Sequence, residues 1–396
     1  MKYNIRKWNP FLISIPDIGI GMYWSLTGTI GSWIVYQHTN SSFLAGLLLS
    51  MAAFTGLFMQ TLSGIASDKT PSHKFLGKRT TWLLVGLVST CIFQMLWPFA
   101  PNYICLFIIA FLTYASINFF QGPYYTMVVE VVDRDQIPFA TLLARTTAQI
   151  GTIIIGLVGA IIWNIGGAFL SCVTVCLLLI IPTLSVIPFI VKERPENQMT
   201  SAFKLSFDIF SDKNINLLFL ATFCMLTGFG AFMPLMGGYM NHHLGFSKDF
   251  TASLVMTFGI GSVIVGLLAT TIINLIKVET IFKIGLLIFA IALICGSFLT
   301  KENFLWYIIA FIVATGFILS QVSCYTLIAK LAPKDRLGEY MGWLNMFFSL
   351  PQLIILICGG VLIDSHLAPY LYWIAGIILI IGFIAVTQIK TNHQES

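Results

Sequence analysis

The 396-residue sequence predicts an all-α polytopic membrane protein with twelve transmembrane helices in two six-helix halves. Three observations support this prediction: a very apolar composition, twelve apolar runs of membrane-spanning length, and an uneven distribution of lysine and arginine. Hydrophobic residues make up 57% of the chain and charged residues only 9%, whereas soluble domains carry roughly 25% charged residues. Because a water-soluble fold could not bury this much apolar surface, we expect the chain to be surrounded by lipid.

The twelve predicted spans follow from length and composition, since a membrane-crossing helix needs about 20 mostly apolar residues. Glycine and proline inside these runs are tolerated, because neighbouring helices can satisfy the backbone groups that they free. The first run follows a short polar and basic segment and lacks a small-residue cleavage site, so we expect a retained helix rather than a signal peptide. The runs occupy residues 11–36, 43–66, 81–99, 103–129, 141–163, 167–190, 215–240, 250–275, 281–299, 303–329, 340–363 and 369–389.

Lysine and arginine set the expected orientation. If the N-terminus is cytoplasmic, the cytoplasmic segments hold 18 of the 21 Lys and Arg residues, and the outer segments hold only Lys248 and Lys301. This is the positive-inside pattern, so both termini are expected in the cytoplasm. The short loops and termini make the inner membrane of a bacterium the expected location. The net charge of +5 is spread over many loops, so we expect no nucleic-acid partner.

Residues 191–214 form the longest interior loop, and their polarity together with Pro195 predicts a linker. The chain then divides into an N-terminal half, 1–190, and a C-terminal half, 215–396. Two six-helix halves with both termini inside is the layout of many transporters, in which the substrate site lies near the middle of the membrane between the halves.

Two ionisable residues lie well inside the predicted spans, Asp17 in the first and Arg145 in the fifth. Such groups are costly in a membrane and mark functional sites. If the two side chains meet, they stabilise each other, because one of them left alone would be an uncompensated charge. They could form a packing-only ion pair, or they could bind substrate, with Asp17 exchanging a proton. A third possibility is that one of them lies in a wet vestibule.

Polar side chains recur at helical spacing in five predicted spans. Each stripe alone could serve hydrogen bonding between helices, but together they predict a central aqueous cavity. The stripes comprise Asp17, Gly21, Trp24 and Gly28; Asn118, Gln121 and Tyr125; Arg145, Gln149 and Thr152; Gln321 and Tyr325; and Asn345, Ser349 and Gln352.

The side chains of this predicted cavity suit a neutral polyhydroxy ligand. Carboxylate, guanidinium and amide groups bond hydroxyls, and an aromatic face covers the apolar side of a sugar ring. Trp24, Tyr124 and Tyr125 are the candidate aromatic residues, with ordinary packing as the alternative. No cofactor or metal is expected, because Cys172 and Cys176 have no His or acidic residue beside them to complete a site.

The segment SGIASDKTPSHKFLGKRTTW, residues 63–82, gathers charge between the second and third spans. It resembles the G-x-x-x-D-[RK]-x-G-[RK]-[RK] pattern of the major facilitator superfamily, with a longer insert. The resemblance implies the major facilitator fold and a latch that holds the outward-open state, in which the acidic residue pairs with a cation and the first glycine lets two helices approach closely. A positive-inside loop without a latch is the alternative. The matching residues are Gly64, Asp68, Lys69, Gly77, Lys78 and Arg79.

The insert is also similar to the D-[RK]-T-x-S-x-x-G-[RK]-R-[RP] form of glycoside–pentoside–hexuronide symporters and their sucrose-transporter-like relatives. Three further stretches agree: PDIGIGMYW, QGPYYTMVVEVVDRDQIPFATLLARTTAQIG and APKDRLGEYMGWLNMFFSLPQLIILICGGVLID. The resemblance implies that Asp17, Arg145 and Tyr125 contact a sugar, and it makes sugar or glycoside symport with protons the expected function.

The chain departs from this group at two places. Gln60 and Gln121 stand where sodium-coupled members carry carboxylates, and an amide cannot supply the negative charge of such a sodium site. The lysine that melibiose-type permeases place on helix 11 is also missing. Sodium coupling is therefore not expected, whereas proton symport, uniport and export all stay open.

Three function classes remain: a transporter working by alternating access, a membrane-embedded enzyme, and a non-transporting receptor. Within the first class, an exporter of drugs or other amphiphiles is the alternative to a sugar symporter, and the 33 Phe and 14 Met residues keep it open. We expect no enzyme and no ATP drive, because the sequence has no H-E-x-x-H, G-x-S-x-G or phosphate-cradling Gly-Lys-Ser/Thr motif. The expected partners are a small-molecule substrate, a proton and the lipid bilayer.

Overall fold

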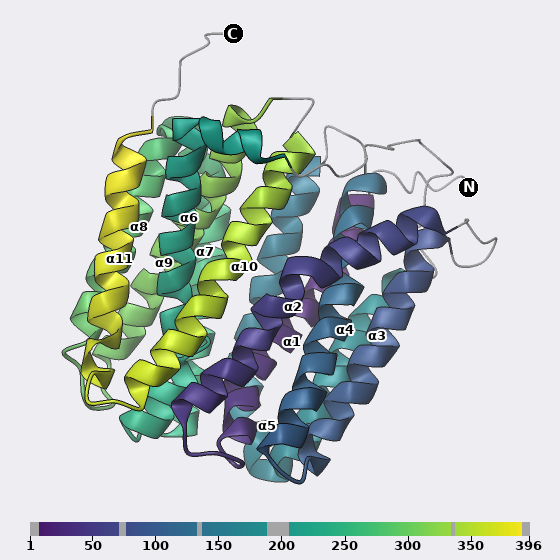
Figure 1. The fold of residues 1–396 in the computed structure, drawn as a ribbon, viewed down its shortest axis with the longest axis vertical. Coiled ribbons are helices and arrows are strands. Elements are labelled where there is room, and N and C mark those ends of the chain that lie inside the picture. Colours follow the sequence, from purple (N-terminus) through teal and green to yellow (C-terminus); the bar gives the residue numbers. More distant parts are fainter. Residues whose placement is uncertain (1–7, 71–76, 133–136, 188–205, 334–336, 390–396) are drawn as a thin grey trace. The chain divides into compact units, whose positions relative to one another are not determined.

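A computed structural model describes residues 8–70, 77–132, 137–187, 206–333 and 337–389, and in these residues every regular element is helical. The first part of the chain forms α1 (Asn9–Val35), α2 (Ser42–Lys69), α3 (Lys78–Leu96), the short η2 (Trp97–Phe99), α4 (Tyr103–Glu130) and α5 (Ile137–Val186) (Figure 1). The later part forms η4 (Phe207–Ser211), α6 (Lys213–Phe232), η5 (Gly237–His243), α7 (Lys248–Leu275), α8 (Val278–Gly296), α9 (Leu305–Leu331), α10 (Leu337–Ile363), η6 (Ala368–Tyr370) and α11 (Leu371–Thr387).

The described helices confirm the predicted all-α polytopic membrane architecture. Ten segments among the described residues are long and apolar enough to cross a membrane, and one of them, Thr146–Val186, is long enough for two crossings. Helix α1, which is not among the ten, has 27 residues. At 1.5 Å per residue it is about 40 Å long, more than the hydrocarbon core of roughly 30 Å. These segments account for all twelve predicted spans.

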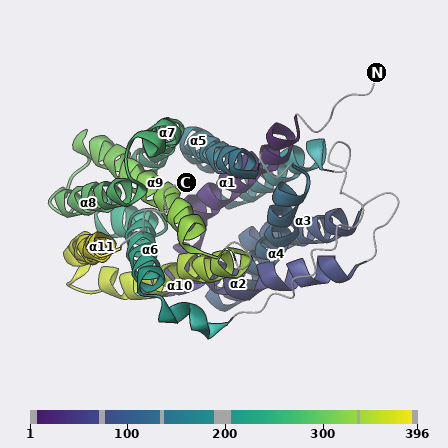
Figure 2. The same ribbon diagram turned by 90° about the horizontal axis from the view of Figure 1, so that it is seen from above.

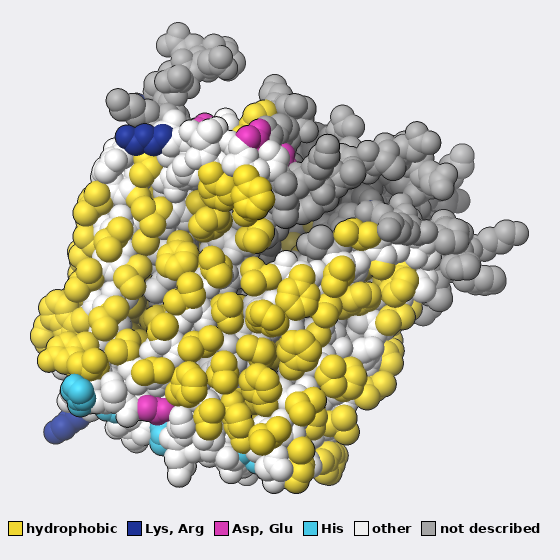
Figure 3. All heavy atoms as spheres, viewed as in Figure 1, with side chains coloured by type: hydrophobic (Ala, Val, Ile, Leu, Met, Phe, Trp, Pro, Cys, Tyr) yellow, Lys and Arg dark blue, Asp and Glu magenta, His cyan; other side chains and the backbone are white. Residues whose placement is uncertain are grey.

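Hydrophobic side chains cover most of the face seen in Figure 3, and charged side chains appear near the ends of the helices. Many of the exposed apolar side chains are large, such as Ile104, Leu267 and Ile291. In water such a surface would be unfavourable, whereas lipid tails solvate it. The distribution of side chains therefore fits helices that cross a bilayer.

Polar residues at the helix starts explain several boundaries. The Ser41 hydroxyl accepts a hydrogen bond from the Leu44 amide at 3.3 Å and begins α2, and Asn102 Oδ1 accepts from the Cys105 amide at 2.9 Å and begins α4. Asp212 caps α6 in the same way. Each cap satisfies amide groups that have no partner in the first helical turn.

The spans predicted at 141–163 and 167–190 are joined within α5. Gly167 interrupts the helix with φ of 56° and ψ of −144°, a conformation that glycine adopts without steric cost. The two spans are therefore a helical hairpin whose turn is a single glycine.

The chain forms two compact units. The first comprises Met1–Gln198 together with Lys248–Gly259, and the second comprises Met199–Ser247 together with Ile260–Ser396. Helix α7 thus contributes its first turns to one unit and its remainder to the other. Most of the predicted linker, 191–214, lies outside the described residues, so the boundary between the halves stays a prediction.

Close packing of α1 against α5 dominates the first unit (Figure 2). A Cβ atom added at Gly21 would overlap the carbonyl of Ala148, and one added at Gly151 would overlap the carbonyl of Ile18. The Thr147 hydroxyl also donates to the carbonyl of Ser14 at 2.9 Å. Small residues and one interhelical hydrogen bond therefore bring these two backbones together, as is common in membranes.

In the second unit, α8 packs against α9 and α11, and α6 packs against α10 and α11. Glycines again allow close approach, because a Cβ at Gly285 would lie 2.9 Å from the carbonyl oxygen of Gly316. The two units thus share one packing principle, with small residues at helix crossings and large apolar residues facing outward.

Gly21→Ala should destabilise the protein by about 1–3 kcal/mol, because the added methyl group has no space beside Ala148 and must push α1 away from α5. The matched control is Gly28→Ala on the same helix, where a Cβ would meet no described atom within 4 Å. Thermal unfolding in detergent, followed by size-exclusion chromatography, measures both variants. Equal melting temperatures for the two variants would contradict the assigned packing.

Candidate functional site

Asp17 lies on α1 and is almost completely buried, with 2% of its surface exposed. The hydroxyl of Tyr124 on α4 lies 2.5 Å from Asp17 Oδ2 and 2.7 Å from the carbonyl oxygen of Ile13, within hydrogen-bonding distance of both. Pro16 has no backbone N–H, so α1 has one internal hydrogen bond fewer in this turn. The buried Asp17 carboxyl is thus bonded to α4, and it follows directly after a proline in α1.

Arg145, the predicted partner of Asp17, lies on α5, and its side chain is outside the described residues. Its backbone is placed by its neighbour Thr147, whose hydroxyl bonds to Ser14, three residues before Asp17 on α1. The backbone of Arg145 therefore belongs to α5, the helix that packs most extensively on α1. The meeting of the two side chains stays a prediction.

Trp24 is half-buried and belongs to an aromatic cluster of the first unit. Its indole stacks on the Tyr114 ring with centroids 6.2 Å apart and planes 6° apart, and Tyr23 meets it edge-on at 5.4 Å. Trp97 in turn meets Tyr114 edge-on at 6.0 Å and donates to the Thr113 hydroxyl at 3.0 Å. The stacking fixes the orientation of the Trp24 ring through the rings behind it.

Two more of the predicted site residues keep partly accessible polar side chains. Tyr125 is half-buried, and its ring lies 5.6 Å from the Tyr124 ring. Gln149 on α5 is also half-buried, and its Oε1 atom is shielded without a hydrogen-bond partner among the described residues. An acceptor in this condition is costly, so it marks a place where a ligand hydroxyl or a water molecule would bind favourably.

Asn118 and Gln121 are buried and bonded to α2. Gln60 Nε2 donates to Asn118 Oδ1 at 3.1 Å and to Gln121 Oε1 at 3.3 Å. Asn118 Nδ2 lies 2.9 Å from the carbonyl of Ala52 and 3.0 Å from the Thr55 hydroxyl. This amide cluster, Gln60, Asn118 and Gln121, joins the two helices. The spacing within α4 predicted that Asn118 and Gln121 share a face, but it carried no information on the facing helix.

The predicted residues of the C-terminal half lie on α9 and α10 of the second unit. Gln321 and Tyr325 are half-buried, and the Tyr325 ring stacks on Phe348 with centroids 5.3 Å apart. Gln352 Nε2 donates to the Phe348 carbonyl at 3.2 Å, and Asn345 is exposed. Tyr325 and Gln352 are thus both placed around Phe348, whereas a cavity shared with the first unit stays a prediction.

The segment predicted to form a latch begins at the end of α2 and ends at the start of α3. Gly77 precedes α3 with a positive φ of 49°. Arg79 is buried, and its Nη1 donates to the Ser67 hydroxyl at 2.5 Å and to the Gly64 carbonyl at 3.5 Å. Arg79 therefore ties the start of α3 to the end of α2.

The close helix approach expected at Gly64 is absent among the described atoms, because a Cβ there would meet none of them within 4 Å. The Gly64 carbonyl instead accepts a hydrogen bond from Arg79. A sequence motif does not reveal a backbone contact of this kind. The side chains of Asp68, Lys69 and Lys78 lie outside the described residues, so their predicted latch stays a prediction.

One cluster was not predicted from the sequence. Lys248 Nζ lies 4.3 Å from the Trp163 ring centroid and 5.2 Å from that of Trp33, within range of cation–π attraction. The next residue, Asp249, accepts from the Asn164 amide at 3.4 Å. The available signal was that Lys248 is one of two lysines outside the positive-inside distribution.

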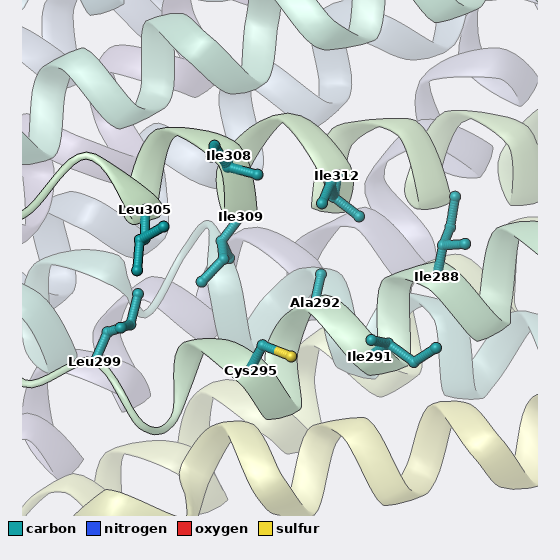
Figure 4. A pocket seen from close by; sticks show the side chains of 9 residues that line it. All are labelled: Ile288, Ile291, Ala292, Cys295, Leu299, Leu305, Ile308, Ile309 and Ile312. Carbon is teal, nitrogen blue, oxygen red and sulfur yellow. The ribbon is translucent and has the colours of Figure 1, made fainter.

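A groove of about 410 Å³ lies between α8 and α9, and Figure 4 shows the side chains that line it. Apart from the thiol of Cys295, the lining side chains are hydrocarbon, and several of them, including Ile291 and Leu305, are exposed. A polar solute would find no hydrogen-bonding partner here, so this groove does not suit a sugar.

Asn118→Leu should destabilise the protein by about 1–3 kcal/mol, because it removes the hydrogen bonds that Asn118 makes to the Gln60 amide, the Thr55 hydroxyl and the Ala52 carbonyl of α2. The control is Ser116→Ala on the same helix, since the Ser116 hydroxyl bonds only to its own helix at Leu112. Thermal unfolding of the two purified variants gives the comparison. If Asn118→Leu were as stable as Ser116→Ala, the cluster would not hold α2 to α4.

The profile of the Major Facilitator Superfamily matches residues 18–213 and 218–394, which together make up most of the chain. A search among curated proteins gave no match. The profile match includes all or most of each of the twelve spans, in two segments, and agrees with the all-helical architecture. The chain therefore belongs to the major facilitator superfamily of membrane transporters.

Proposed function

We propose that this transporter moves a sugar or glycoside together with a proton by alternating access, as the glycoside–pentoside–hexuronide group does. The observation that supports this most is the buried Asp17 carboxyl, bonded to Tyr124 on another helix. Maintaining a carboxyl inside a membrane helix is costly, so its presence favours a role in binding or coupling over packing alone.

A polyhydroxy substrate fits the first unit chemically. The Trp24 ring, oriented by Tyr114 behind it, offers an aromatic face to the apolar side of a sugar. Gln149 Oε1 needs a donor, which a sugar hydroxyl supplies. Tyr125 offers a phenolic group on α4. The residues proposed from the second unit are Gln321, Tyr325, Asn345 and Gln352.

The amide cluster favours protons over sodium as the coupling ion. The Gln60 amide already donates to the side-chain oxygens of Asn118 and Gln121. These neutral amides also lack the negative charge that a cation site between α2 and α4 would use. Asp17 is then the proposed proton carrier, because a carboxyl can change its charge during the cycle.

In the proposed cycle, the two halves rock about a central substrate. Loading draws Asp17 and Arg145 together around the ligand, and the segment 63–82 opens when the cytoplasmic side opens. The proposed orientation, with both termini in the cytoplasm, rests on the distribution of lysine and arginine, and the proposed location in the inner membrane of a bacterium rests on the short loops and termini.

Export of drugs or other amphiphiles is the alternative, and one observation favours it. Around the proposed second-unit residues, Tyr325 stacks on Phe348, and Phe229 stacks on Phe317 with centroids 4.5 Å apart. Aromatic surroundings of this kind suit an apolar ligand better than a strongly hydrated one.

Uptake into sealed vesicles of purified protein distinguishes these functions. A panel of labelled mono- and disaccharides is tested with and without an inward proton gradient. Gradient-stimulated accumulation of one sugar supports the symporter. No accumulation by folded protein would contradict it, and efflux of amphiphiles loaded inside the vesicles would then support the exporter.

Asp17→Asn and Arg145→Ala should each abolish gradient-driven uptake while the protein stays folded in the membrane. The first removes the exchangeable charge, and the second removes the only charged residue of α5, which is proposed to meet Asp17. Uptake is measured alongside the amount of protein in the vesicles. Wild-type rates in either variant would show that the residue is outside the binding and coupling site.

Asp68→Asn should slow the transport cycle while leaving substrate affinity unchanged, because the proposed latch lies at the end of α2, away from the substrate site. Equilibrium binding and initial uptake rates are compared for the sugar found in the panel. An equal loss of binding would argue against a gating role for Asp68.

A further inference from the structure

The Tyr124 hydroxyl has two close oxygen neighbours but only one proton. Asp17 Oδ2 lies 2.5 Å from Tyr124 Oη, and the Ile13 carbonyl oxygen lies 2.7 Å from it. If Asp17 is ionised, both neighbours are acceptors, and one of the two oxygen pairs has no proton between its atoms. Two oxygens this close without a proton repel each other.

A proton on Asp17 resolves this conflict. The acid then donates from Oδ2 to Tyr124 Oη, and the tyrosine donates its own proton to the Ile13 carbonyl. Every short contact now contains one proton, and the chain of two hydrogen bonds links α1 to α4. Such chains strengthen each other in surroundings of low dielectric constant.

We infer that Tyr124 is the positioning residue that converts the charge of Asp17 into a change in the contact between α1 and α4. In the protonated state the contact is closed. When Asp17 loses its proton, the tyrosine turns its donor to the carboxylate, and the Ile13 carbonyl beside Pro16 loses its side-chain partner. This inference rests on the proposed role of Asp17 as proton carrier.

The position of Ile13 explains how a change in the charge of Asp17 would alter the conformation of α1. Pro16 has no N–H to donate to the Leu12 carbonyl, next to Ile13, so a side-chain donor from α4 is more important in this turn than in an uninterrupted helix. Loss of that donor loosens α1 at its proline, in the helix that also carries Trp24.

Few other ionisable groups are present on the helices that contact α1. Gln60 on α2 is neutral, and Tyr125 lies beside Tyr124 on α4. Arg145 on α5, which is proposed to meet Asp17, would oppose its protonation, so a ligand that engages Arg145 would favour the closed contact. The remaining charged residues of α2 and α4 are Asp68 and Lys69 at the end of α2 and Glu130 at the end of α4, and Lys248 at the start of α7 lies 5.2 Å from the centroid of the Trp33 ring of α1.

Hydrogen–deuterium exchange of the α1 backbone tests the inference without a substrate. Full-length protein in lipid nanodiscs is labelled from mildly acidic to mildly alkaline buffer, and rates are corrected for the intrinsic effect of pH on amide exchange. In the wild type, residues 12–18 should exchange roughly tenfold faster at alkaline pH, the effect of losing one buried hydrogen bond. Difference infrared spectra should show the protonated Asp17 carboxyl disappearing over the same range.

Three variants give different expected results. Tyr124→Phe should exchange at the fast rate at every pH, because the link is absent. Asp17→Asn should exchange slowly at every pH, because the amide donates to Tyr124 as the acid does, and this holds even if Tyr124→Phe fails to fold. Tyr103→Phe is the matched control and should behave as the wild type, since the Tyr103 hydroxyl on α4 bonds only to the Leu44 carbonyl at 2.8 Å.

Wild-type pH dependence in Tyr124→Phe would overturn the inference, as would an Asp17 carboxyl that stays ionised throughout. If the Tyr124 hydroxyl were purely structural, the exchange rates of residues 12–18 in Tyr124→Phe would differ from those of the wild type by a factor that does not change with pH. The same would hold for Tyr103→Phe. Because no sugar is needed, a protein that moves no sugar yet shows the switch would refute the proposed substrate and leave the inference standing.

Discussion

Hydrogen-bonding groups inside a bilayer must find their partners within the protein, because lipid tails offer none. In the first unit this requirement is met across helices. Tyr124 of α4 bonds to Asp17 and Ile13 of α1, and Asn118 of α4 bonds to Ala52 and Thr55 of α2. Helix α4 is therefore the polar centre of this unit, while α1 and α5 are held mainly by close backbone packing. Polar bonding fixes which helices are neighbours, and small residues fix how near they come.

The architecture could be predicted from the sequence because its causes are local. A run of about 20 apolar residues is already a helix in lipid, and the distribution of Lys and Arg gives the expected orientation without any knowledge of packing. The N-caps Ser41 and Asn102 also act within one turn, so they place the starts of α2 and α4 within a residue or two of the predicted spans. The same reasoning identified Asp17 as exceptional, because an acidic residue inside an apolar run stands out whatever surrounds it.

The partners of these residues could not be predicted, because they lie on other helices. Helical spacing grouped Asn118 with Gln121, yet only the facing helix reveals that Gln60 bonds to both. Tyr124 was a candidate aromatic surface, whereas its hydroxyl between Asp17 and Ile13 is the more informative feature. Lys248 illustrates the same limit, since its two tryptophans come from α1 and α5, far away in sequence. A sequence pattern shows which side chains share a face, and packing decides what that face meets.

The single-glycine turn in α5 has a consequence for how the protein is made. Gly167 alone separates two spans, so no hydrophilic loop exists there to be carried across the membrane during synthesis. The first span of the hairpin cannot complete its crossing and wait, because the second begins at once. We therefore expect the two spans to enter the bilayer as a pair, because Gly167 leaves no intervening loop.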